Sequence, residues 1–271
     1  MTMIAPCRTH QPPLNALGLA KAARLVYKSA DQILVDPDYQ RWNFDRCQFL
    51  SRNHTQALIT GNDRLLILAF RGTERSALKD WMTNIDVAQI PDFGGNVHRG
   101  FTLALYSVLH QIQSTLTRFR DNHQPLFITG HSLGGALATL ATVILEEMNY
   151  SVQATYTFGS PRVGDRSFSQ AFDQKFWFRT FRFVNHNDVV TRVAPRQFGR
   201  FDYDHVGQCL YFDAAGQLHQ ADGFQFWQHF KYSVRGSMDD FLNPSGRFGI
   251  TDHEITAYER NLALNTDYLR N

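Results

Sequence analysis

The stretch Leu126-Phe-Ile-Thr-Gly-His-Ser-Leu-Gly-Gly135 decides the fold. It opens with an apolar run short enough for a buried strand, and the pentapeptide Gly130-His-Ser-Leu-Gly134 follows at once. Residues 135–145 are rich in Ala and Leu, which predicts a helix. A strand that passes through Gly-x-Ser-x-Gly into a helix is the context of a nucleophile elbow, whose strained turn presents the serine hydroxyl. We therefore predict that Ser132 is a nucleophile.

Two other interpretations of this stretch are weaker. A Gly-rich turn at a helix N-terminus can bind phosphate, but no Gly-Lys-Ser/Thr follows it. Residues 126–144 carry no formal charge and have nearly the length of a membrane span. The glycines at positions 130, 134 and 135 interrupt that span, so a strand, a turn and a helix are favoured.

The bulk composition predicts a single α/β domain over residues 1–271, because no linker, charge run or repeat divides the chain. With 43% apolar and 13% aromatic residues, the chain can build a sizeable core. A formal net charge of +2, without a cluster of Lys and Arg, argues against a nucleic-acid partner.

The three cysteines, Cys7, Cys47 and Cys209, are odd in number and widely spaced. They form neither a disulfide framework nor a metal-ligand pattern, which suits a reducing compartment. Residues 1–11 lack the pattern of a signal peptide. We expect a cytoplasmic protein without a transmembrane segment, a metal or a cofactor.

Apolar patterns place further elements along the chain. Helices are predicted at 13–27, 101–116 and 255–264, the last with a capping box from Thr251 to Glu254. Strands are predicted at 56–60, 65–70, 152–158, 179–184, 206–212 and 217–219. Strands that alternate with helices favour a largely parallel central sheet between helical layers.

Residues 74–90 follow the strand at 65–70 and place apolar side chains at helical spacing, among them Trp81, Met82 and Ile85. The pattern is typical of a surface helix with a buried face. A mobile flap over a pocket is the less favoured alternative.

A serine hydroxyl needs a base to remove its proton, and the base needs an acid to orient it. In α/β hydrolases these partners follow the serine in the order acid, then histidine, in loops after later strands. Asp188 suits the acid best, because it lies in a polar turn just after the strand at 179–184. Weaker strand patterns precede the competing acids, which are Asp165, Asp202 and Asp204.

Two of the eleven histidines remain candidates for the base. His253 lies downstream of every other site residue, on a loop before the last helix, and is favoured over His205. We expect His131 and His186 to point away from the site, because each is a sequence neighbour of a site residue. The backbone N–H of Leu133 is the default donor to the oxyanion, and Thr73, which ends the segment Arg71-Gly72-Thr73, is the expected second.

Taken together, the motifs resemble the class 3 lipase family, which includes the fungal triacylglycerol lipases. The matching pieces span residues 14–265 in the family's order. They are Phe70-Arg-Gly-Thr73, Asp80-Trp81, Val97-His98-x-Gly100-Phe101, Gly130-His-Ser-Leu-Gly-Gly135, Thr157-Phe-Gly-Ser-Pro-Arg-Val-Gly164, Arg182-x-Val-Asn-x-x-Asp188, Tyr203-x-His205-x-Gly207 and Asp252-His253.

The resemblance implies an α/β-hydrolase fold with a short helical lid within residues 74–90. It implies Ser132, Asp188 and His253 as the triad, Thr73 and Leu133 as the oxyanion hole, and a structural role for His205. We also expect aromatic residues in the segment 224–241, among them Phe226 and Trp227, to cover or line the acyl pocket together with the lid. The alternative is that they belong to the core.

The function implied is hydrolysis of acylglycerol esters at a lipid–water interface through an acyl-enzyme. Two alternatives remain open. One is the same chemistry on a polar lipid, as in a phospholipase A1 or galactolipid lipase. The other is a catalytically dead, lipase-like scaffold protein.

Overall fold

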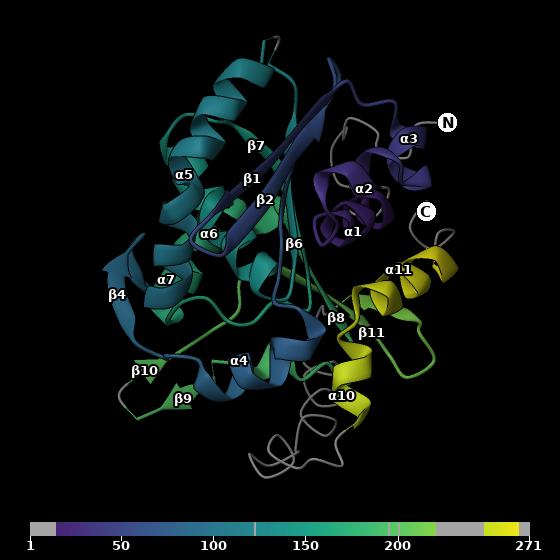
Figure 1. Cartoon of the computed structure of the whole chain (residues 1–271). Coiled ribbons are helices and arrows are strands. Elements are labelled where there is room, and N and C mark those ends of the chain that lie inside the picture. Colours follow the sequence, from purple (N-terminus) through teal and green to yellow (C-terminus); the bar gives the residue numbers. More distant parts are fainter. Residues whose placement is uncertain (1–14, 122, 195, 200, 221–246, 266–271) are drawn as a thin grey trace.

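A central eight-stranded sheet organises the chain in this computed structural model, which describes residues 15–121, 123–194, 196–199, 201–220 and 247–265 (Figure 1). The strands follow one another across the sheet in the order β1-β2-β3-β6-β7-β8-β11-β12. Their bounds are β1 Arg46–Arg52, β2 Thr55–Gly61, β3 Leu66–Phe70, β6 Leu126–His131, β7 Val152–Phe158, β8 Thr180–Asn185, β11 Gln208–Phe212 and β12 Leu218–Gln220.

The middle of this sheet, from β3 through β6, β7 and β8 to β11, is parallel, and both margins are antiparallel. Parallel strands have their carboxyl ends at one edge, where the loops that carry functional side chains in open α/β sheets are found. Two small antiparallel pairs lie outside the sheet. They are β4 Gln89–Asp92 with β5 Gly95–His98, and β9 Gln197–Phe198 with β10 Phe201–Asp202.

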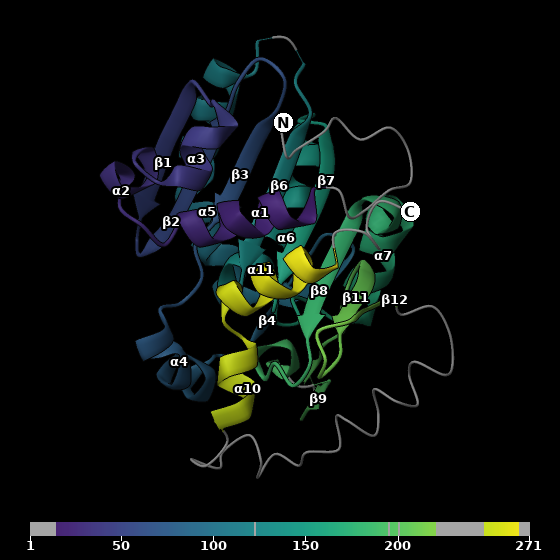
Figure 2. The ribbon, with the colours of Figure 1, turned by 90° about the vertical axis from the view of Figure 1, so that its right-hand side faces the viewer.

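Helices cover both faces of the sheet (Figures 1 and 2). One face packs on α5 Arg99–Phe119, α6 Leu133–Glu147 and α7 Arg166–Phe176. The other packs on α1 Ala16–Leu25 and α11 Ile255–Leu264, which lie side by side. The remaining helices are α2 Ala30–Leu34, α3 Pro37–Trp42, α4 Leu78–Asn84, α10 Arg247–Asp252 and the 3-10 turns η1 Arg75–Ala77, η2 Trp177–Arg179 and η3 Val190–Arg192.

The central strands are buried on both faces, as the uninterrupted apolar runs predicted. Every residue of β3 and β6 is buried, and alternate side chains enter the two cores. Leu66, Leu68 and Phe70 of β3 join the core under α5 and α6, whereas Ile67 and Ala69 join the core under α1.

Most predicted elements are present, and two have the predicted bounds: the strand at 152–158 and the helix at 255–264. The capping box of that helix is wrong. Its N-cap is Glu254, without a side-chain cap hydrogen bond, and Thr251 lies within α10. The helical pattern over 74–90 is also shorter than predicted, because α4 ends at Asn84 and Ile90 belongs to β4.

No helix of the part of the chain that the structure describes is long and apolar enough to cross a bilayer.

Candidate active site

Ser132 is the turn between β6 and α6, and its backbone lies in the left-handed region with φ 58° and ψ −131°. Non-glycine residues rarely adopt this conformation, and it stores strain at functional sites. The flanking glycines make the turn possible by close approach: a Cβ on Gly134 would lie 2.2 Å from the Phe70 carbonyl oxygen. The segment after β3 is thereby brought against the start of α6.

The Ser132 side chain is 0% exposed, and its Oγ has no hydrogen-bond partner among the described residues. The same is true of Nε2 of His253. A buried polar atom without a partner costs about 1–3 kcal/mol, so two of them in one site require an explanation. Both atoms are those that the proton transfer from Ser132 to His253 would use.

His253 lies in the link between α10 and α11, and its Nδ1–H donates to Asp188, at 2.9 Å from each carboxylate oxygen. Asp188 follows β8 and is 1% exposed. Two further donors reach this carboxylate, the Tyr258 hydroxyl at 2.6 Å and the Val190 backbone N–H at 2.9 Å. Because Nδ1 is the donor, Nε2 of the neutral ring is left as an acceptor.

Burial by itself raises the pKa of the Asp188 carboxyl. The positive charge of His253 and the hydrogen bonds from His253 and Tyr258 outweigh burial, so the pKa lies below its ordinary value. Asp188 is therefore ionised at neutral pH and can stabilise an imidazolium at His253.

Gly159, directly after β7, lets the backbone touch this pair. It has φ +59°, and a Cβ there would lie 2.5 Å from Oδ2 of Asp188 and 2.8 Å from Nδ1 of His253. The first glycine after the strand at 152–158 is thus a close-approach position beside the acid and the base.

The segment Arg71-Gly72-Thr73 lies beside Ser132, the predicted nucleophile, because a Cβ on Gly72 would be 3.0 Å from Cβ of Ser132. Leu133 begins α6, where the first backbone N–H groups have no intrahelical acceptor. Both predicted oxyanion donors are therefore next to Ser132. Thr73 also lines a cavity of about 210 Å³ together with Tyr27, His131 and His253.

The expectation that His131 points away from the site is wrong. Its Nε2–H donates to the His253 carbonyl oxygen at 2.6 Å, its Nδ1 accepts from the Tyr27 hydroxyl at 2.9 Å, and the two imidazole centroids are 4.4 Å apart. Burial, then the charge of His253, lower the pKa of His131 to about 3. A neutral His131 therefore supports the backbone of His253, the predicted base.

His205 is partly buried, makes none of these contacts, and donates from Nε2 to the Thr191 carbonyl oxygen at 2.9 Å. Thr191 Oγ1 in turn donates to the Asp188 carbonyl oxygen at 2.9 Å. His205 thus braces the turn after Asp188. Among the competing acids, Asp165 caps α7, whereas Asp202 and Asp204 line a separate charged cleft with Arg166 and Arg196.

The inner face of α4 covers the segment that follows Asp188. Leu78 and Met82 are buried with Val190 and Val193, and the residues packed on this cluster include Trp81, Ile85 and Ile250. The predicted lid residues therefore face inward. Phe226 and Trp227, the other residues predicted to line the acyl pocket, lie outside the described residues.

An ion pair connects the covering segment to the base. Arg75 of η1 pairs with Glu254, the residue directly after His253. The side chains of Arg75 and Glu254 also line the cavity of about 210 Å³ described above, together with Thr73 and His131.

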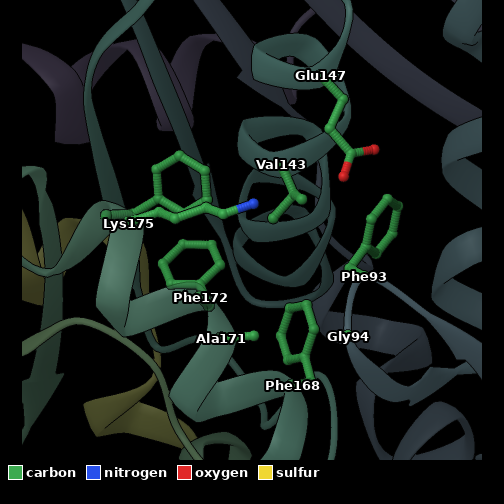
Figure 3. Close-up of a pocket in the computed structure, with 9 residues that line it drawn as sticks. Phe93, Gly94, Val143, Glu147, Phe168, Ala171, Phe172 and Lys175 are labelled. Atoms are coloured by element: carbon green, nitrogen blue, oxygen red, sulfur yellow. The ribbon is translucent and has the colours of Figure 1, made fainter.

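A second cleft of about 280 Å³ lies between α6, α7 and the β4–β5 turn, and contains none of the predicted site residues (Figure 3). It is walled by Phe93, Phe168, Phe172 and Phe176, with Lys175 and Glu147 also lining it.

Buried histidines predict that the protein loses stability as the pH falls below 6.5. Burial lowers the pKa of His98 to about 4, that of His131 to about 3 and that of His205 well below 6.5. Between these values and 6.5 only the unfolded chain binds the protons, so the imidazoles of His98 and His131 should each cost about 2 kcal/mol of unfolding free energy at pH 5. His205 acts in the same direction. Burial raises the pKa of the Asp173 carboxyl to about 6. Its protonation in the folded state should therefore add back about 1 kcal/mol of unfolding free energy at pH 5.

Urea unfolding at pH 7 and pH 5 measures this loss. The matched variant is His98→Asn, which keeps a side chain that can cap α5, where His98 Nδ1 accepts from the Phe101 N–H. Its stability should fall by about 2 kcal/mol less than that of the wild type over this pH interval. An equal fall in both proteins would contradict the assignment to His98.

Comparison with known proteins places the site in context. Residues 67–198 match the family described as Lipase (class 3). The triacylglycerol lipase OBL1 of Arabidopsis thaliana is 27% identical, over 91% of this chain and 56% of its own length. Phospholipase A1-II 3 of Oryza sativa subsp. japonica is 29% identical, over 50% of this chain and 40% of its own. The chain thus spans about half the length of these curated relatives.

The Rhizomucor miehei lipase, in a propeptide complex, superposes with a TM-score of 0.63 at 22% identity, over 76% of this chain and 70% of that one. This similarity shows a shared fold. The α/β-hydrolase fold predicted from the sequence is confirmed.

Proposed function

Because residues 67–198 belong to the class 3 lipase family, we propose that the protein hydrolyses acylglycerol esters through an acyl-enzyme on Ser132. The observation that carries the proposal is the Asp188–His253 pair, joined at 2.9 Å, together with the strained, buried Ser132. The two are linked through β7, because the Ser132 N–H donates to the Phe158 carbonyl oxygen and the next residue, Gly159, approaches the pair. The same geometry argues against a catalytically dead scaffold, since a scaffold needs neither the Asp188–His253 pair nor the strained backbone of Ser132.

In the proposed reaction, His253 Nε2 takes the proton of Ser132 as Oγ attacks the ester carbonyl carbon. The backbone N–H of Leu133 and a hydrogen-bond donor of Thr73 stabilise the oxyanion that develops on the carbonyl oxygen. His253 then protonates the leaving alcohol. Water attacks the acyl carbon with His253 again as base, and His253 returns that proton to Ser132 Oγ as the acyl–oxygen bond breaks and the carboxylic acid is released. Asp188 compensates the imidazolium charge in both steps.

The segment η1–α4 acts as a lid in this proposal. With Ser132 fully buried, an ester cannot reach Oγ unless the covering segment moves. Opening would expose Leu78 and Met82, and each apolar side chain of this size gains about 1.5–3 kcal/mol on leaving water. A lipid surface would therefore favour the open state.

A phospholipid is the second candidate substrate, because the cavity is bordered by charged side chains, namely Arg24, Glu74, Arg75 and Glu254. Such a border suits a charged headgroup better than a third acyl chain. The curated relatives include both triacylglycerol lipases and phospholipases A1.

Hydrolysis of a tri-, a di- and a phosphoglyceride with matched acyl chains tests the function. Each is assayed below and above its solubility limit. We expect the rate to rise when the ester forms an interface, and the fastest substrate identifies the class. Absence of turnover with every ester would contradict the proposed function.

The variant Arg75→Gln in the same assay tests the lid. The Arg75–Glu254 pair is partly exposed, with 66% and 33% of the two side chains accessible, so its loss should raise the rate on dissolved ester by at most about fivefold. Asp121→Asn removes an ion pair with Arg46 elsewhere and should leave the rate unchanged. An Arg75→Gln rate equal to that of the wild type would argue against an ionic latch.

A further inference from the structure

The acid and the base reach the site from distant parts of the chain, and one residue joins them. Asp188 follows β8, whereas His253 follows α10. Oδ2 of Asp252 accepts from the backbone N–H of Asn187 and from Nδ1–H of His186, both at 3.1 Å. The carboxylate next to the base is thus bonded to the two residues that precede the acid.

The backbone of Asp252 makes a third bond to the same segment. Its carbonyl oxygen accepts from the Asn185 side-chain amide at 2.8 Å. Asn185 is 3% exposed and is itself fixed by α11, because Asn261 Nδ2 donates to its Oδ1 at 3.0 Å. Residues 185–187 are therefore bound to Asp252 through a side chain, a backbone amide and a ring.

These hydrogen bonds hold the segments that carry Asp188 and His253, which must lie within hydrogen-bonding distance of each other. Both Asp188 and His253 stand outside regular secondary structure, at the ends of β8 and α10, so helix or strand hydrogen bonds do not set their separation. A displacement of about 1 Å within a catalytic constellation can cost about 10²-fold in rate.

We propose that Asp252 is a positioning residue, which holds the segment of the acid and the segment of the base in register through its bonds to Asn187 and His186. The proposal rests on the proposed function. In this proposal the Asp252 carboxylate positions the acid and the base, and it makes no hydrogen bond to the Ser132 hydroxyl among the described residues.

The test compares Asp252→Ala with Asp252→Asn on a soluble p-nitrophenyl ester. Alanine removes the side-chain acceptor, so kcat should fall by about 10- to 100-fold while KM stays within about twofold. Asparagine keeps an oxygen that can accept from the same two donors, so it should restore kcat to within about threefold of the wild type.

The chain supplies a matched control in Asp213, which accepts from Nε2–H of His219 at 2.8 Å and from two backbone N–H groups in the β11–β12 turn. Asp213→Ala removes an aspartate–histidine pair of the same kind that has no bond to residues 185–188 or 252–253 among the described contacts. We expect its kcat to match that of the wild type.

Thermal unfolding and complete, slow labelling of Ser132 by a fluorophosphonate would show that Asp252→Ala is folded. If alanine prevents folding, Asp252→Ser, whose hydroxyl is too short to reach both donors, takes its place with the same expectation. A folded Asp252 variant without the acceptor that keeps the wild-type kcat overturns the proposal, as does an asparagine variant as impaired as alanine. Absence of hydrolysis and labelling in the wild type would instead overturn the proposed function.

Discussion

Replacement of Ser132 by alanine is expected to lower ester hydrolysis by about a million-fold and to abolish labelling by a fluorophosphonate. The reason is that Oγ supplies the electron pair that forms the acyl-enzyme. The remaining groups, the oxyanion donors and the cavity, can support only slow attack by water. Rates on a soluble ester and mass spectrometry of the labelled protein measure the two effects.

The folded state should tolerate this change, because the Ser132 hydroxyl makes no hydrogen bond among the described residues. Alanine keeps the backbone strain at φ 58°, whereas Ser132→Gly would relieve it. We expect the glycine variant to be equally inactive and more stable by about 1–3 kcal/mol. A glycine variant that is more stable but inactive would show that the strained turn at Ser132 lowers stability in order to present the hydroxyl.

A control for serine loss in general is Ser169→Ala. Ser169 is buried in α7 and donates to the His205 carbonyl oxygen at 2.7 Å, away from the cavity. This variant should lose some stability and keep both its activity and its labelling. Labelling retained in Ser132→Ala would show that another residue is the nucleophile.

The elements that the sequence predicts well are those whose determinants are local. The strand β7 and the elbow follow from apolar runs and from glycines that relieve specific close approaches. Gly159, in the Gly-Ser-Pro turn after β7, is such a position. The placement of Ser132, Asp188 and His253 in one site follows from the order in which hydrolases use their strands, together with the resemblance to class 3 lipases.

Local sequence patterns do not predict the contacts between segments that are distant in the chain. Tyr258 looks like an ordinary apolar position of the last helix, yet its hydroxyl donates to Asp188 because α11 packs across the sheet beside α1. His131 likewise depends on distant segments. It accepts from the hydroxyl of Tyr27, which lies just after α1, and donates to the carbonyl oxygen of His253, which lies just before α11. The polar edge strand β1 has weak apolar alternation and gave no usable signal.

Replacement of Asp188, the proposed acid of the triad, should also have a large effect on catalysis. We expect Asp188→Asn to lower kcat on a soluble ester by about 10³- to 10⁴-fold. The carboxylate has only acceptors, and donors surround it. Tyr258 and Val190 approach its two oxygens, and His253 Nδ1 is near both. An asparagine amide must aim its NH₂ group at one of these donors, so the imidazole loses its orientation and its charge partner.

The direction of the Asp188 pKa sharpens the test. Because that pKa lies below its ordinary value, Asp188 stays ionised through mildly acidic solution, and its protonation cannot account for any loss of activity near pH 5 to 6. We therefore compare the two proteins at pH 8, which lies above the ordinary pKa of an imidazole, so that the ratio of wild-type to Asp188→Asn rates reports the lost carboxylate and not protonation of the histidine. A ratio below about tenfold at this pH would contradict the role of Asp188 as the negative partner of His253.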